Sequence, residues 1–286
     1  MNALYHRSLE EHAFAVVNPL QVPPAQWRDL PHRPLVPKTL AAQPHLLPIL
    51  VDLGQMDATS RVGLLERSER WDRGYDEPFF SALLTTDATD SQVAQHLTRQ
   101  MMVRGPAGGE NLLRLFDPRV FRHLRWLLTP MQLDALLGPI DAWTWRDQHQ
   151  SWKQQLRTTR VTMHWRPSGV QWDSLARLGL LNRVLKQLGR VEPALVCDDD
   201  LAQRADRLLR ESWEVQGLVD EADRRIFAEQ ALRFHADIHR HPQLAQRLAQ
   251  ARAGECSYVG ACSDLDDTSM RGLARQTAQD TTRTIA

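Results

Sequence analysis

Residues 113–124 read LRLFDPRVFRHL, and the hydrophobic pattern changes its period in the middle of this stretch. From Leu113 to Phe116 the side chains alternate between two faces, whereas from Pro118 onward the apolar residues recur at helical spacing. At the change, Asp117 can accept from the free N–H groups of a first helical turn. Pro118 suits the first helical position because it has no N–H to leave unpaired. The stretch therefore predicts a strand, an Asp cap and a helix.

Arg119 is the residue that this interpretation leaves unexplained. A cation in the first turn of a helix opposes the helix dipole, so an anionic partner would make its position favourable. Asp117 is the nearest carboxylate. We favour a local ion pair between Asp117 and Arg119 that fixes the turn, because such pairs are common at protein surfaces. Contact between Arg119 and another protein is the alternative.

The composition gives no general attraction to anionic partners. The 286 residues carry 35 Lys and Arg against 35 Asp and Glu, so the formal net charge is zero. Such a balance provides no field that would draw the chain to nucleic acid or to an anionic membrane. Nearly all the basic residues are arginine, whose planar group pairs with carboxylates through two hydrogen bonds. We therefore expect protein partners, with no nucleic acid and no membrane.

No segment has the pattern of a secretion signal or a membrane span. The first residues, MNALYHRSLEEHAF, are acidic where a signal peptide needs a basic start and an apolar run. The apolar run at 45–53 is broken by Pro48 and Asp52, and it is far shorter than the roughly 18 residues that a span needs. Three cysteines are too few for a disulfide framework, so we expect a cytoplasmic chain with reduced thiols. They are Cys197, Cys256 and Cys262.

Two strands and a helix are predicted before the opening stretch. Residues 13–24, AFAVVNPLQVPP, read as a short buried strand ended by prolines, and residues 79–86 read as a second. Thr89 and Gln92 then form a capping-box pattern that begins a helix. Residues 79–116 therefore fit a strand–helix–strand unit, for which a right-handed crossover and parallel pairing are expected.

The chain after the opening stretch has equally clear boundaries. Thr129 precedes a proline and begins a helix over 130–137, which Gly138 ends. Residues 140–147, IDAWTWRD, read as a strand, and residues 157–165 are expected to pair with it across a polar turn.

Beyond Pro167 the pattern is helical, with a long amphipathic stretch expected to end near Gly189 and three further helices. After Gly254 the residues are small, polar and weakly periodic, which favours disorder. The predicted class is α+β. We expect a mixed α/β lobe with a central sheet over 1–166, a helical lobe over 167–253 and a flexible tail over 254–286.

No constellation of residues predicts catalysis, a metal or a cofactor. The GPAGGE stretch at 105–110 lacks the Lys and Ser/Thr of a P-loop, so we interpret it as a turn, and no GxSxG nucleophile elbow is present. His235, His239 and His241 are the best metal candidates, but contacts with helix ends are favoured. The acids at 198–200 are expected to cap a helix.

Tryptophan is the enriched aromatic residue, with nine in the chain. Trp143 and Trp145 occupy alternate positions of a predicted strand and would share one face. Packing beneath helices is the favoured interpretation. A protein-binding surface is the alternative, because Trp and Arg often provide most of the energy of protein interfaces.

The region 110–147 resembles the effector chaperone, or adaptor, family of bacterial type VI secretion. The family motif is an apolar strand with an internal Arg, then Asp-Pro-Arg, a helix, a Leu-rich helix, Gly-Pro and an aromatic strand. It is matched here at residues 113–119, Leu133, Gly138 with the following Pro, and Trp143. Upstream, AFAVVNPL is similar to the family's opening strand and HLLPILVDLG to its second block, so the resemblance covers residues 14–152.

The resemblance implies a cytoplasmic, non-catalytic protein that needs no cofactor. Its partners would be a toxic effector and the VgrG spike protein, onto which it would help to load that effector, and the helical lobe over 167–253 would be the variable part that recognises the effector. The residues expected to form the motif or to face a partner are Arg114, Phe116, Asp117, Pro118, Arg119, Trp143 and Trp145.

Two alternatives remain open at this point. One is a hydrolase or metal-dependent enzyme whose dispersed residues the sequence does not bring together. The other is an immunity protein that neutralises a toxin, which would also be cytoplasmic and without catalysis.

Overall fold

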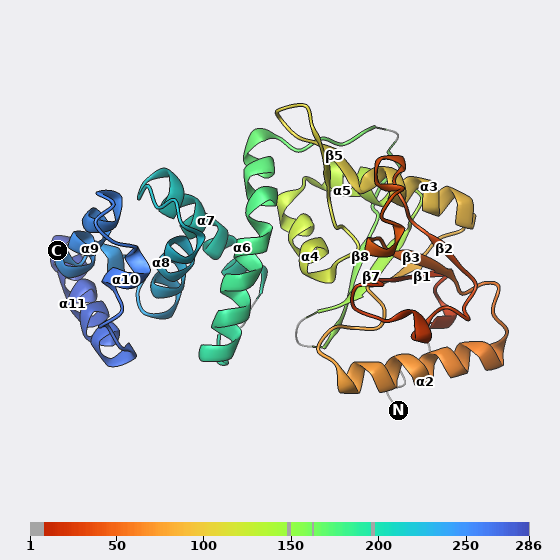
Figure 1. Ribbon diagram of the computed structural model, residues 1–286, viewed down its shortest axis with the longest axis horizontal. Coiled ribbons are helices and arrows are strands. Elements are labelled where there is room, and N and C mark those ends of the chain that lie inside the picture. The colour runs from red at the N-terminus through yellow and green to blue at the C-terminus, as the bar shows by residue number, and fades with distance from the viewer. Residues whose placement is uncertain (1–8, 148–149, 162, 196–197, 286) are drawn as a thin grey trace. The chain divides into compact units, whose positions relative to one another are not determined.

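The computed structural model describes residues 9–147, 150–161, 163–195 and 198–285. The chain divides into two compact units, residues 1–172 (unit 1) and 173–286 (unit 2). Unit 1 holds the β-sheet together with helices, and unit 2 is helical (Figure 1). The predicted α+β class is therefore confirmed. Among the described residues, no helix is both long enough and apolar enough to cross a bilayer.

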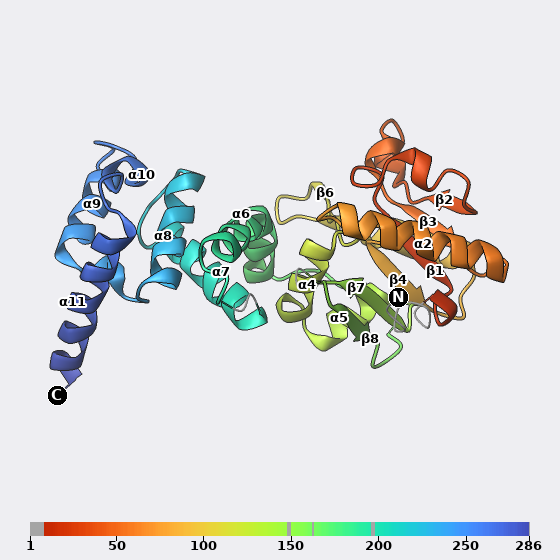
Figure 2. The same cartoon turned by 90° about the horizontal axis from the view of Figure 1, so that it is seen from below.

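A six-stranded antiparallel sheet forms the centre of unit 1, in the order β2-β3-β1-β4-β7-β8. The strands are β1 (Phe14–Val17), β2 (His32–Pro34), β3 (Ile49–Asp52), β4 (Ala82–Thr85), β7 (Ala142–Arg146) and β8 (Trp152–Leu156). A separate hairpin of β5 (Met102–Arg104) and β6 (Glu110–Leu112) projects from the unit (Figure 1, Figure 2). Three short 3₁₀ helices lie between β1 and β3: η1 (Pro24–Gln26), η2 (Lys38–Leu40) and η3 (Pro44–Leu46).

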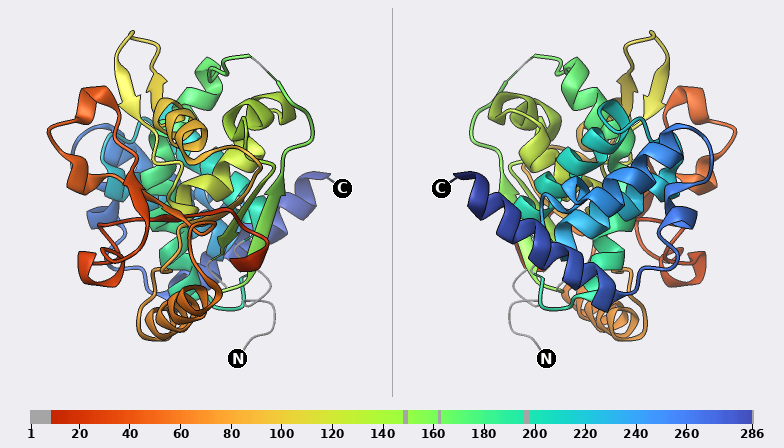
Figure 3. Two further views of the ribbon diagram at one scale, coloured as in Figure 1. Left: turned by 90° about the vertical axis from the view of Figure 1, so that its right-hand side faces the viewer. Right: turned by 90° about the vertical axis from the view of Figure 1, so that its left-hand side faces the viewer.

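Helices cover both faces of this sheet (Figure 3). One face packs against α2 (Ala58–Gly74), which the sequence pattern does not predict because only four of its residues are buried. Asp57 begins α2 by accepting a hydrogen bond from the Ser60 backbone N–H at 2.8 Å. The other face lies beneath α3 (Asp90–Gln100), α4 (Pro118–Leu127) and α5 (Pro130–Leu137). The sheet is thus the middle layer of the unit.

The predicted parallel strand–helix–strand unit is wrong. β4 pairs antiparallel with β1 and β7, and the chain after α3 enters the β5–β6 hairpin instead of rejoining the sheet. Residues 113–116 form no strand. A strand would point Leu115 and Phe116 to opposite faces, whereas a turn lets both side chains enter the core, where they are 2% and 1% exposed.

The predicted partner of the aromatic strand is also wrong. β8 pairs with β7 over 152–156, ahead of the expected segment 157–165. The Asp147 N–H donates to the Ser151 carbonyl at 2.8 Å and closes the hairpin early; residues 148 and 149 of this turn lie outside the described residues. Asp134 on α5 then accepts from the backbone N–H groups of Thr158 and Thr159 at 2.8 and 2.9 Å. Those groups are therefore not available to a strand ladder.

The local helix signals of unit 1 are confirmed. Capping boxes begin α3 at Thr89 and α5 at Thr129, and in both helices the side chain of the third residue returns to the cap. Gly138 ends α5 with a φ of 57°, in the left-handed region that favours glycine. The predicted buried strand at the start of the chain is β1, all four residues of which are buried.

Unit 2 is built from packed helices. Its elements are α6 (Gly169–Val191, which begins four residues before the division), α7 (Asp199–Glu214), α8 (Glu221–Arg233), η4 (Ile238–Arg240), α9 (Pro242–Arg252), α10 (Tyr258–Ala261) and α11 (Asp267–Ile285). Asp198 caps α7, as the acidic run predicts. α6 continues past Gly189, where its end was expected, to Val191.

The expected disorder after Gly254 is wrong, because this part of the chain includes the long helix α11 (Figure 3) and contributes residues to the unit 2 core. Tyr258 is fully buried, and its hydroxyl donates to the Gln230 side chain at 2.8 Å. On α11, Met270, Leu273 and Thr277 lie three and four residues apart and are all buried. Among the α11 side chains whose burial the structure describes, these three are the buried ones, so the hydrophobic pattern is too sparse to predict the contact.

Candidate protein-binding site

A tight turn brings the chain from the β5–β6 hairpin into α4. The Leu113 N–H donates to the Met101 carbonyl at 2.7 Å, and the Asp117 N–H donates to the Arg114 carbonyl at 2.8 Å. Leu113 is also buried. Both ends of this turn are therefore fixed by backbone hydrogen bonds, and its apolar side chains face the core.

Asp117 performs the two roles that the sequence predicts for it. Its Oδ1 accepts from the Arg119 backbone N–H at 2.9 Å and so caps α4. Both carboxylate oxygens also accept from the Arg119 guanidinium, at 3.0 and 2.8 Å. The Asp117 side chain is 5% exposed and that of Arg119 is 54% exposed. The local ion pair that we favour is therefore present, and hydrogen bonding to Asp117 raises the pKa of Arg119.

Arg114 is the second cation of the junction. Its guanidinium carbon lies 5.6 Å from the centroid of the Phe116 ring, and its side chain is half-buried. No carboxylate oxygen in the described part of the chain lies within 4.0 Å of the Arg114 guanidinium nitrogens, the distance that defines an ion pair. Arg114 is therefore a cation that rests on an aromatic ring and has no anionic partner there.

Trp143 and Trp145 point into the core of unit 1. They are 2% and 1% exposed. The Trp143 ring stacks on Phe121 of α4 at 4.6 Å between centroids, and Phe121 meets Trp145 edge-on at 5.2 Å. The guanidinium of Arg125 lies 5.4 Å from the Trp145 centroid. Core packing beneath a helix, which we favour from the sequence, accounts for both indoles.

The structure separates the seven expected residues into a buried group and a surface pair. Phe116, Asp117 and Pro118 are buried with the two tryptophans and hold the junction in place. Arg114 and Arg119 reach the surface from opposite ends of the turn. The candidate binding site of unit 1 therefore consists of these two guanidinium groups on a rigid turn.

The three histidines of unit 2 have separate structural contacts. His239 stacks on Phe227 at 3.7 Å between ring centroids, and loss of hydration lowers its pKa to about 3. His241 accepts from the Gln243 N–H at 3.3 Å and caps α9, while His235 accepts from the Asp237 N–H at 3.2 Å. Within the described ranges, no three His, Cys, Asp or Glu residues gather in a metal-binding arrangement.

The remaining sequence motifs also have local roles. The GPAGGE stretch is the turn of the β5–β6 hairpin, in which the Gly105 N–H donates to the Gly109 carbonyl at 2.8 Å. Cys256 is exposed and Cys262 is buried, both as free thiols, and Cys197 lies outside the described residues.

Sequence reasoning missed a groove in unit 2. It has a volume of about 540 Å³ and runs along α7, with its far wall formed by Ala231 of α8 and by Ala236. A signal for it exists in the sequence, since Arg204, Leu208 and Val215 recur at helical spacing on one face of α7. This face of α7 contains both charged and apolar residues, unlike the apolar face that packs in a core. The hydrophobic period alone therefore does not predict a groove there.

Comparison with known proteins bears on unit 1. No curated protein and no solved structure matches this chain. The family model described as a domain of unknown function, DUF4123, matches residues 13–135, from the residue before β1 to the last turns of α5, and so includes the whole junction from Arg114 to Arg119.

Proposed function

We propose that this chain is a non-catalytic cytoplasmic chaperone that binds a toxic effector of type VI secretion and promotes its loading onto the VgrG spike protein. One observation carries the proposal. The DUF4123 match spans the same Asp-Pro-Arg junction whose residues resemble the effector chaperones. The fold supports this role, because the junction is a rigid element that presents two cations at the surface.

Binding at this junction would rely on the unpaired cation. Arg114 has no carboxylate partner in the described part of the chain, so a carboxylate of another protein would gain a charged hydrogen bond there. Arg119 is already held by Asp117 through two hydrogen bonds and would contribute less. In this proposal the protein shields and positions its effector by contact and then releases it, with no change in covalent bonds.

Affinity purification from the native cytoplasm tests the proposal. The tagged full-length protein is recovered at moderate salt while the secretion genes are expressed, and the bound proteins are identified by mass spectrometry. We expect VgrG together with one large toxin-like protein. Recovery of neither would contradict the chaperone function. Recovery of a toxin that the chain inhibits, without any need of the chain for secretion, would indicate an immunity protein instead.

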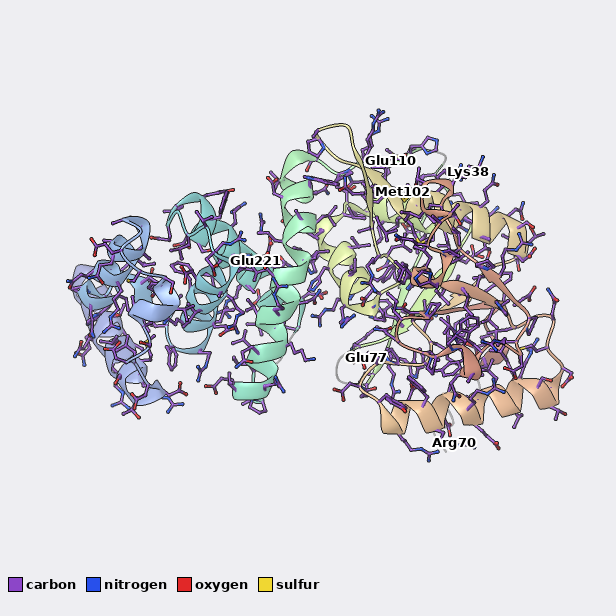
Figure 4. All side chains as sticks on the ribbon, viewed as in Figure 1. Lys38, Arg70, Glu77, Met102, Glu110 and Glu221 are labelled. Atoms are coloured by element: carbon purple, nitrogen blue, oxygen red, sulfur yellow. The ribbon has the colours of Figure 1, made fainter. Side chains whose placement is uncertain are left out.

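A charge reversal tests the role of the junction itself. Arg114→Glu should reduce recovery of a partner without unfolding the chain, since it breaks no ion pair in the described residues. Arg119 is less suitable, because its reversal would place a carboxylate against Asp117. Arg70→Glu is the matched control, since Arg70 is exposed on α2, away from the junction (Figure 4). Equal recovery with Arg114→Glu and Arg70→Glu would exclude Arg114 from the binding site.

A further inference from the structure

The groove of unit 2 has a definite arrangement of charges. The residues that line this α7 groove are Arg204, Arg207, Leu208, Arg210, Glu211, Glu214, Val215, Ala231 and Ala236. Arg210 pairs with Glu214 at 3.9 Å. Arg204 and Arg207 lie within one turn of each other, and neither meets a carboxylate within 4.0 Å in the part of unit 2 that the structure describes. The N-terminal half of the groove is therefore positive and without a counter-charge.

The negative charges of the groove lie at its other end. Glu211 also has no ion-pair partner among the described side chains, and it lies seven residues after Arg204, about 10 Å along the helix. The groove thus changes from positive to negative along α7. A nucleic acid would meet repulsion between its phosphates and this acidic end, whereas a peptide can match both signs.

Apolar side chains also line the groove. Leu208 is half-buried between the two charged ends, and Val215 is 67% exposed at the acidic end. Of the two alanines that line the groove, Ala231 is only 3% exposed, whereas Ala236 is exposed and its small side chain can contact a partner. Apolar contact at the centre and charged contact at the ends is the usual organisation of a groove that binds an amphipathic helix.

We propose that the α7 groove binds an amphipathic helix of the effector. The helix would direct two carboxylates of one turn toward Arg204 and Arg207 and an apolar side chain toward Leu208 and Ala236. A basic or neutral polar residue of the helix would then lie beside Glu211. Identification of the partner as the effector rests on the proposed function, whereas the chemistry of the bound helix follows from the groove alone.

Synthetic peptides test the chemistry of the groove on the full-length chain. The probe is a labelled amphipathic helix with two Glu three residues apart and Leu on the adjacent face, and its counterpart carries Lys in place of Glu. We expect the Glu peptide to bind at least about tenfold more tightly in fluorescence anisotropy. The preference should disappear in Arg204→Glu/Arg207→Glu. It should persist in Arg190→Glu/Arg275→Glu, which has the same change in charge at exposed sites outside the groove.

The effector recovered by affinity purification tests the identity of the partner. Its affinity should fall at least about tenfold with Arg204→Glu/Arg207→Glu and remain within about twofold of wild type with the control pair. Equal binding by all three proteins would overturn the groove as an effector site and leave the chaperone function standing. If no effector binds even the wild-type chain, the chaperone function fails, and the peptides decide whether the groove selects acidic helices. A peptide preference that is absent, or that survives reversal of both arginines, would overturn the proposal.

Discussion

At the scale of single residues, Gly138 is the position where a close contact excludes a side chain. Its φ is 57°, and a Cβ built there would lie 2.1 Å from the His96 ring. His96 is buried and held by a 2.8 Å hydrogen bond between its Nε2 and the Leu136 carbonyl. The ring therefore has little freedom to move away from a substituted Gly138.

We expect Gly138→Ala to lower the free energy of unfolding by about 2 kcal/mol or more, from backbone strain together with the clash. Denaturant unfolding of the full chain, followed by tryptophan fluorescence, measures this loss. Gly63→Ala is the matched control, because Gly63 is an exposed residue of α2 with no atom near the added Cβ. The control should be stabilised by about 0.5–1 kcal/mol. Similar effects at both positions would show that His96 does not restrict Gly138.

A buried histidine makes unit 1 sensitive to acid. His12 is 6% exposed, its Nδ1 lies 2.8 Å from the Thr85 hydroxyl, and burial lowers its pKa from 6.5 to about 4. Between these pKa values the unfolded chain binds a proton that the folded chain does not. The free energy of unfolding should therefore fall by up to about 3 kcal/mol as the pH drops from 6.5 to 4.

Unfolding by denaturant at a series of pH values checks this dependence. In His12→Asn the fall over the same window should be smaller by the contribution of this residue. In unit 2, burial also lowers the pKa of His239, so protonation of His239 should also reduce the free energy of unfolding as the pH falls. This contribution should be the same in wild type and in His12→Asn. An unchanged pH dependence in His12→Asn would contradict the assignment.

At the scale of elements, a buried ion pair joins α6 to α7. The Arg177 Nε donates to the Asp206 Oδ1 at 3.1 Å, and the Ser174 hydroxyl donates to the other oxygen at 2.8 Å. The charged side chains are 13% and 11% exposed. This network holds one position of α6 against one position of α7 with directional hydrogen bonds.

Removing one partner of this pair should be costly. Arg177→Ala leaves a buried carboxylate without its cation, and we expect a loss of about 3–5 kcal/mol in the free energy of unfolding. The double variant Arg177→Met/Asp206→Leu should recover most of that loss, because apolar side chains replace both charges. Thermal unfolding by circular dichroism compares the three proteins. If the double variant were no more stable than Arg177→Ala, the loss in Arg177→Ala would not be due to the unpaired carboxylate, and this prediction would be wrong.

At the scale of the whole molecule, each unit has a hydrophobic core of its own, as the clusters around Val51 in unit 1 and Phe227 in unit 2 show. The last helix, α11, belongs to the unit 2 core through Met270 and Leu273. A chain that ended before this helix would expose the apolar residues against which it packs. Stability of unit 2 therefore depends on residues whose sequence is mostly polar.

Substitutions on α11 distinguish a packed helix from a flexible tail. Leu273→Ala should lower the free energy of unfolding by about 2–5 kcal/mol, because it removes a buried side chain from the core. Arg275→Ala, at an exposed position of the same helix, should change it by less than about 0.5 kcal/mol. Amide hydrogen exchange should also be slow across the buried stretch of α11. Fast exchange there, with both variants as stable as wild type, would restore the interpretation as a tail.

Agreement between sequence and structure is best where the physical signal is local. The caps at Thr89, Asp117, Thr129 and Asp198 each involve a side chain and an N–H two or three residues away, so the pattern contains both partners of the hydrogen bond. The ion pair between Asp117 and Arg119 is predictable for the same reason.

The errors concern partners that are distant along the chain. Leu115 and Phe116 alternate like strand residues, but the core of unit 1 accepts both side chains only from a turn. The strand that pairs with β7 is decided by the Asp147 turn and by Asp134, which holds the segment predicted to pair. The pattern of α11 is too sparse to reveal its burial, because most residues of the core that it joins come from α8, η4, α9 and α10.

The sequence by itself determined the α+β class, the approximate positions of α3 to α9, the caps of four of these helices, the buried first strand and the charged junction at 114–119. Each of these depends on spacing between neighbours, which the order of residues contains directly. Only the tertiary structure decided the antiparallel sheet order, the choice between core packing and a binding surface for Trp143 and Trp145, and the α7 groove. These features depend on which segments pack against each other and bury apolar surface. The segments lie tens of residues apart in the sequence, so the local hydrophobic period does not show which of them will pair.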